Sequence, residues 1–156
     1  MSNLPRAFVC SALLVAVSCL GASPPPTAEV EEQTGSGVPE FQRLEEALKH
    51  VVEEENLLAY RGVVGGSERF PIVLPSGVET DNWTVNAYFR EVFRPFGDAA
   101  HRDLATLLTH EHLFVQVGSF AVLNQTMTAN GLRFHLDQTP EERMEVQREL
   151  IALLEG

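Results

Sequence analysis

One dipeptide, Asn130-Gly131, separates the two fold classes open to this chain. Asn-Gly between apolar stretches is the strongest short-range signal for a β-hairpin, and the alternation of apolar residues at 132–136 favours a strand after it. The preceding stretch, 113–126, also fits a helix, because its apolar and small residues recur at helical spacing. These residues alone leave two architectures open: a mainly α domain, and an α+β domain with a hairpin at 113–137.

Helical spacing of apolar residues is clearer elsewhere in the chain. We expect helices over 39–60, 82–96 and 98–110, with Pro39 in the first turn of the first and Asp98 capping the third. A last helix is expected after Thr139, because Thr139 and Glu142 have the spacing of a capping box. Its predicted buried residues are Val146, Leu150, Leu153 and Leu154.

Two segments are candidates for an interaction surface. Residues 61–81 are rich in glycine and proline, include a possible short strand in "FPIVLP", and form a connection long enough to suggest a function. The helix at 82–96 is the most aromatic segment. Its residues Trp83, Tyr88 and Phe93 either pack in the core or form an exposed surface for a partner.

The charge balance argues against some partners. The chain has 11 basic and 22 acidic residues, a formal charge of −11. Nucleic-acid binding requires clustered Lys and Arg, so we expect no nucleic-acid partner. An apolar content of 44% is ordinary for a globular protein and allows a hydrophobic core.

The first 18 residues have the features of a signal peptide. Arg6 precedes an apolar stretch, 7–18, which is too short to span a bilayer. The Pro-, Ser-, Gly- and Glu-rich residues 19–38 are then expected to form a disordered tether, and 39–156 a helical domain. The two cysteines are Cys10 and Cys19, so the domain itself contains no disulfide.

The stretch "VAVS-C", Val15 to Cys19, resembles the lipobox of bacterial lipoproteins. That resemblance implies that the Cys19 thiol receives a diacylglycerol, becomes the first mature residue and anchors the protein to a membrane. Leu20, where a retention signal would have Asp, implies delivery to the outer membrane of a Gram-negative envelope. An ordinary signal peptide and a secreted protein are the alternative.

A second resemblance concerns the C-terminal part of the chain. The stretch "HLFVQVGSFAVLN" resembles the second helix of a HEAT-type repeat, and "AAHRDLATLLTHEH" is similar to the first helix and turn of such a unit. The tail resembles one that follows helical repeats in bacterial envelope proteins; its matching residues are Thr128, Gly131, Phe134, Asp137 and Pro140–Arg143. The resemblance implies a mainly α domain in which Asn130-Gly131 is a loop turn.

Catalytic chemistry has no clear signature in this sequence. His101, His110 and His112 are candidate metal ligands, but a helical metal site needs ligands four residues apart, whereas His110 and His112 are two apart. No Gly-x-Ser-x-Gly nucleophile motif occurs. We therefore expect no catalytic residue, cofactor or metal, and no enzymatic activity.

Three functional hypotheses follow from these patterns. The first is a lipid-anchored envelope protein whose helical domain binds an unidentified protein partner. The second is a secreted metal-binding or enzymatic domain that uses the His101–His112 region. The third is a eukaryotic secreted glycoprotein, since Asn82 and Asn124 begin Asn-x-Thr triplets.

Overall fold

A computed structural model describes residues 35–156 and is mainly helical, which confirms the predicted mainly α class. The predicted signal peptide, the lipid-attachment residue Cys19 and most of the predicted tether lie outside the described residues. No helix within 35–156 has the length and apolar character needed to cross a membrane.

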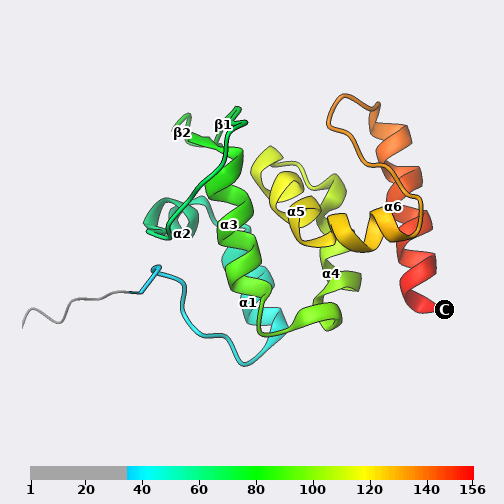
Figure 1. The fold of residues 1–156 in the computed structure, drawn as a ribbon, viewed down its shortest axis with the longest axis horizontal. Helices are drawn as coiled ribbons and strands as arrows, with labels where there is room; N and C mark the ends of the chain where they lie inside the picture. The colour runs from blue at the N-terminus through cyan, green and yellow to red at the C-terminus, as the bar shows by residue number, and fades with distance from the viewer. Residues whose placement is uncertain (1–34) are drawn as a thin grey trace, which may run out of the picture. The chain divides into compact units, whose positions relative to one another are not determined.

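The elements follow one another as a series of helices with one small sheet (Figure 1). The helices are α1 (Leu44–Val51), α2 (Glu54–Ala59), α3 (Asn82–Phe93), α4 (His101–Thr106), α5 (Leu113–Ala129) and α6 (Pro140–Glu155). Two 3-10 turns, η1 (Gly97–Ala100) and η2 (Leu107–Thr109), flank α4. The antiparallel strands β1 (Pro71–Val73) and β2 (Glu79–Asp81) pair Pro71 with Asp81 and Val73 with Glu79.

Helix α5 is the centre of the domain. It packs most extensively on α3 and also contacts α4, η2 and β1. Its sequence is apolar on nearly every side, as expected of a helix surrounded by other elements. The alternative hairpin at 113–137 is therefore wrong: α5 runs unbroken to Ala129, and Gly131, at φ +72°, turns the chain away after it.

Aromatic side chains of α3 fill the core beside α5. Tyr88 and Phe89 are completely buried and Phe93 is 2% exposed. The prediction that Tyr88 and Phe93 belong to an exposed interaction surface is therefore wrong, because both side chains are buried; Tyr88 packs against His50 and Tyr60. Trp83 is half-buried, and its indole N–H donates to the carbonyl of Glu68, which ties the 61–70 segment to α3.

Two of the predicted helices are divided in the structure. The single helix expected over 39–60 is replaced by α1 and α2, because the chain turns at Glu53, whose backbone is extended. The side-chain amide of Asn56 donates to the carbonyl of His50 at 3.0 Å and so satisfies an open carbonyl at the end of α1. Pro39 lies before α1, and Asp98 lies within η1 instead of capping a helix.

The last helix forms as predicted. Thr139 Oγ1 accepts from the N–H of Glu142 at 3.2 Å, and the Glu142 carboxylate accepts from the N–H of Thr139 at 2.8 Å, a complete capping box. Leu150 is buried, whereas Leu153 is 51% exposed, which corrects its predicted burial. Helix α6 packs against α4 and η2, and Leu153 lies outside the side of the helix that makes this contact.

The folded part begins slightly before the predicted boundary at residue 39. The carbonyl of Ser36 accepts from the N–H of Arg61 at 2.7 Å, and the Ser36 hydroxyl donates to Glu91. Val38 packs against the core. Residues 36–38, which composition assigns to the tether, therefore belong to the domain.

Candidate functional site

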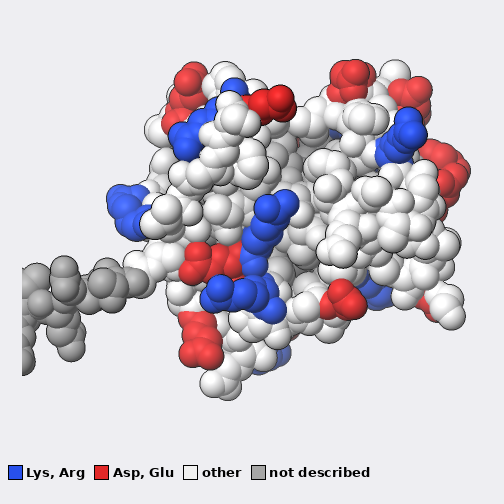
Figure 2. Space-filling model, in the orientation of Figure 1, with Lys and Arg blue, Asp and Glu red and all other residues white. Residues whose placement is uncertain are grey.

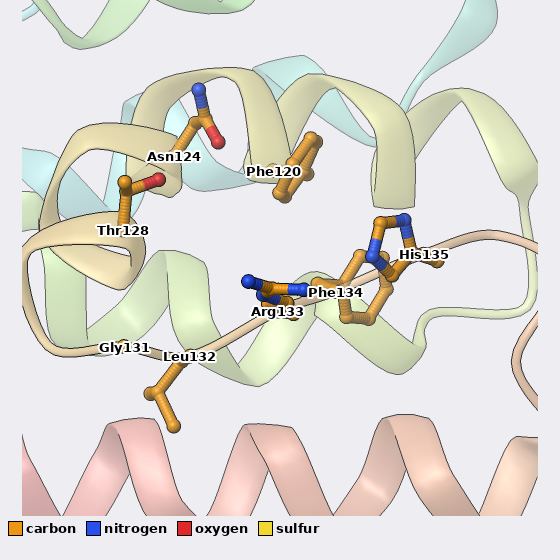
Figure 3. Close-up of a pocket in the computed structure, with 8 residues that line it drawn as sticks. All are labelled: Phe120, Asn124, Thr128, Gly131, Leu132, Arg133, Phe134 and His135. Carbon is orange, nitrogen blue, oxygen red and sulfur yellow. The ribbon is translucent and has the colours of Figure 1, made fainter.

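An apolar groove runs beside α5. It consists of two hollows, of about 520 Å³ and about 410 Å³, that share Phe120, Phe134 and His135, and we call the pair the α5 groove. The larger hollow is lined by apolar side chains from three parts of the chain: Phe70, Val117, Phe120, Phe134 and Leu136. The smaller one lies between α5 and the loop that follows it (Figure 3).

The wall opposite α5 is held in place by hydrogen bonds within its own loop. The N–H of Leu132 donates to the carbonyl of Met127 at 2.9 Å, which reverses the chain after α5. Gln138 then binds this loop twice, accepting from the N–H of His135 at 2.8 Å and donating to the carbonyl of Arg133 at 3.2 Å. The groove is thus bounded by a fixed loop, which favours binding with little reorganisation.

Two phenyl rings connect this wall to the helix. Phe134 is 4% exposed, and its ring stacks on that of Phe120 with centroids 5.6 Å apart. Figure 3 shows Phe120 extending from α5 toward the loop that carries Phe134. At the other end, Phe70 and Leu136 remain 43% and 39% exposed, so the groove presents apolar surface to solvent.

Two asparagines of α3 line the larger hollow one helical turn apart. Asn82 is 8% exposed, and its Oδ1 accepts from the N–H of Phe70 at 2.8 Å. Asn86 Oδ1 is buried, yet it has no hydrogen-bond partner within residues 35–156. A buried acceptor without a donor costs about 1–3 kcal/mol, a cost that is removed if the Asn86 side chain turns its oxygen toward an N–H group in the hollow.

The register of these asparagines is set by the start of α3. Asp81 caps the helix, with Oδ1 accepting from the N–H of Thr84 at 2.9 Å. The N–H of Asn82 also donates to the carbonyl of Phe70 at 3.2 Å. Two hydrogen bonds therefore join Phe70, the residue before β1, to Asn82 at the start of α3. Phe70 and the two asparagines therefore keep a fixed relation at one end of the groove.

The predicted histidine ligands do not converge on one place. The rings of His110 and His112 lie 5.1 Å apart, and His110 Nδ1 accepts from the N–H of His112 at 3.1 Å. Burial lowers the pKa of His110, helped by the neighbouring His112 and opposed by Glu111. His101 instead contacts Thr126 and Asp98. Within 35–156, no three His, Cys, Asp or Glu side chains are grouped so that they could hold a metal ion.

The two candidate glycosylation sites differ in accessibility. Asn124 is exposed on α5, at the border of the smaller hollow. Asn82 is only 8% exposed, and its side-chain oxygen is held by the N–H of Phe70, so its amide is not presented to solvent for modification. The prediction of Asn82 as a glycan acceptor is therefore wrong for the folded domain.

Comparison with models of protein families, with curated proteins and with solved structures finds no match. The lipobox and HEAT-type resemblances therefore remain predictions from the sequence.

Sequence reasoning missed most of the groove. Phe134 carried a signal, as a matching residue of the C-terminal tail motif, and Phe70 lies in the 61–81 segment already marked as a candidate surface. Asn86 and Phe120 had no signal, because each is an unremarkable helical position until α3, α5 and the loop are brought together.

Proposed function

We propose that the protein is a binding module that holds an extended, mainly apolar polypeptide segment of a partner protein in the α5 groove. The single observation that carries this proposal is a hollow of about 520 Å³ that is lined mostly by apolar side chains, two of them substantially exposed, together with the side chains of Asn82 and Asn86. Apolar walls supply affinity and a few placed polar groups supply orientation, which is the usual composition of a binding site.

A polypeptide fits the polar groups of this groove better than a purely apolar ligand does. A carboxamide has an acceptor and two donors, and so can pair with both the N–H and the C=O of a peptide backbone. The carboxamide of Asn86, turned toward the hollow that the residue lines, supplies an acceptor for one N–H group. A hydrocarbon chain would leave that oxygen without a donor, at the full cost of its desolvation.

The exposed apolar side chains explain where side chains of the segment bind. Phe70 and Leu136 line the same hollow and keep 43% and 39% of their surfaces exposed. Covering apolar surface gains about 25 cal/mol per Å². A segment that lies between these two residues buries both, and its neighbouring residues can continue along Phe120 and Phe134 into the smaller hollow.

We also propose that this module is attached to a cell envelope through a lipid on Cys19. The support is the sequence alone: an apolar stretch followed by "VAVS-C" and by residues suited to a tether. Mass measurement on protein from its native source tests this. The proposal expects a chain that starts at a diacylglycerol-modified Cys19. An unmodified Cys19, or hexose mass on Asn124, would contradict it.

Panning a random peptide library against the immobilised full chain tests the groove itself. Phe70→Ser with Leu136→Ser should weaken the selected peptides by about tenfold or more, equivalent to ~1.4 kcal/mol. Both residues are substantially exposed, so the fold should tolerate the change. Leu153→Ser is the matched control, since Leu153 is 51% exposed on α6 and lies outside the groove. Equal weakening by the control and the groove variant would refute the proposal.

A further inference from the structure

Five arginines of the described domain lack an acidic partner, and three of them, Arg90, Arg94 and Arg133, line the hollows beside α5. Most of the other basic residues form ion pairs, namely Arg43, Lys49, Arg69, Arg102 and Arg148. Two more bind neutral groups: Arg61 binds backbone carbonyls and Arg143 binds the amide oxygen of Gln116. Within 35–156, Arg90, Arg94 and Arg133 have no carboxylate at ion-pair distance. In a chain with 22 acidic and 11 basic residues, this grouping leaves a local excess of positive charge.

Arg90 and Arg94 border a hollow of about 310 Å³ between α3 and α5, which we call the basic pocket. The two residues are one turn apart at the end of α3, so their guanidinium groups share one side of the helix. Arg90 Nε donates to the carbonyl of Ala121 at 3.3 Å, which fixes the group against α5 and leaves its terminal nitrogens for a ligand. Figure 2 shows basic side chains between α3 and α5, with acidic side chains beside them.

The basic pocket adjoins the α5 groove. Asn124 lines both the basic pocket and the smaller hollow, and Arg133 lines that same hollow from the loop side. The chain therefore presents a continuous path from apolar rings to unpaired guanidinium groups. Like charges one turn apart repel each other, and an anion between them would relieve that repulsion.

We infer that the basic pocket binds the carboxylate of an acidic residue in the polypeptide segment that occupies the α5 groove. This inference rests on the proposed function and adds a specificity to it. The planar guanidinium groups of Arg90 and Arg94 each present paired N–H donors that match a carboxylate. Asp98 lies at the edge of the pocket but its carboxylate is directed to His101, at 3.6 Å from Nε2.

The overall charge favours a peptide carboxylate over a membrane surface. An anionic bilayer would face the whole domain, whose acidic excess repels it. A single carboxylate on a bound segment meets only the local field of the basic pocket. The acidic excess also disfavours anion binding on the rest of the domain surface. An acidic residue of the partner therefore strengthens binding only where it meets the basic pocket.

The experiment compares selections from one random peptide library on three forms of the full chain. These are the wild type, Arg90→Gln with Arg94→Gln, and a control with Arg102→Gln and Arg148→Gln, which changes net charge equally at exposed ion pairs. The wild type and the control should enrich peptides that combine apolar residues with Asp or Glu. The basic-pocket variant should enrich the apolar residues alone. An enriched acidic peptide should bind the basic-pocket variant about tenfold more weakly than it binds the wild type. The same peptide with Asn or Gln in place of Asp or Glu should bind all three chains alike.

The outcomes separate this inference from the proposed function. Apolar peptides without enrichment of Asp or Glu on the wild type would overturn the inference and leave the proposed function intact. Failure to enrich any peptide that depends on Phe70 and Leu136 would overturn both. Binding of phosphatidylglycerol vesicles to the wild type but not to the basic-pocket variant would overturn the inference in favour of a lipid headgroup.

Discussion

Gly118 of α5 lies directly against the ring of Phe89 in α3. A Cβ atom added to Gly118 would stand 2.2 Å from Phe89 Cδ2, far inside contact distance. Phe89 is completely buried and has no free space into which to move. Helices α3 and α5 can therefore approach this closely only because residue 118 has no side chain. The same approach sets the relative position of the residues that line the groove.

Gly118→Ala should destabilise the domain by about 1–3 kcal/mol, the cost of overpacking a core. Alanine is the better helix former by roughly 1 kcal/mol, so a destabilisation must come from the contact with Phe89 and not from propensity. Urea unfolding measures the change. Gly65→Ala is the matched control, since nothing lies within 4 Å of a Cβ at Gly65. A Gly118 variant as stable as this control would contradict the close packing of α3 and α5.

The last helix shows what the sequence alone could predict. Its capping box involves only Thr139 and Glu142, and its start was correctly placed because such signals are local. The break at Glu53 was missed, since it depends on the contact of Asn56 with His50 six residues away. Periodicity across the break is continuous, so a single helix looked equally acceptable.

The groove shows what the sequence could not predict. Phe70, Asn86 and Phe134 belong to three segments whose meeting depends on the packing of α3 against α5. No local pattern encodes that Asn86 Oδ1 is buried without a partner. The aromatic content of α3 was recognised, but periodicity does not state which side of the helix α5 covers.

Two partly enclosed histidines should make the domain less stable in acid. Burial lowers the pKa of His50 below its ordinary value of 6.5, opposed by Glu53, and burial together with His112 lowers that of His110. In the unfolded chain these rings take up protons near pH 6.5, whereas in the folded chain they do so only at lower pH. The unfolded state therefore binds more protons in this window, and stability rises with pH.

The stabilising effect of the two neutral histidines is present above pH 6.5 and is lost as the pH falls through their lower folded pKa values. Urea unfolding at a series of pH values on either side of 6.5 measures the slope. Replacing His50 and His110 with Gln removes both titrations and should flatten the slope in this window. A double variant with the slope of the wild type would show that other groups cause the acid sensitivity.

Gln147 joins α6 to the rest of the domain. Its Nε2 donates to the carbonyls of Ala105 and Thr106 at 2.8 Å each, and its Oε1 accepts from the hydroxyl of Thr109 at 3.1 Å. Gln147→Ala removes these three hydrogen bonds at the end of α4, where the Ala105 carbonyl keeps another partner, the N–H of Leu107. The variant should lose about 1–3 kcal/mol and increase hydrogen exchange in α6 before the rest of the domain.

Arg148→Ala is the control for this prediction. The neighbouring residue is exposed and forms an ion pair with Glu145 on the surface, a contact expected to contribute less than about 1 kcal/mol. Hydrogen exchange in α6 should therefore stay close to that of the wild type in the Arg148 variant. Equal effects of the two substitutions would mean that the Gln147 hydrogen bonds do not hold α6 in place.

The central claim is that the α5 groove holds a polypeptide segment, and NMR chemical-shift mapping with a library-selected peptide tests it most directly. We predict that the peptide shifts the side-chain amide signal of Asn86 and the ring signals of Phe70, Phe120 and Phe134, while the methyl signals of Leu153 on α6 stay unchanged. Shifts centred on α6, with the Asn86 and Phe120 signals unmoved, would contradict the account.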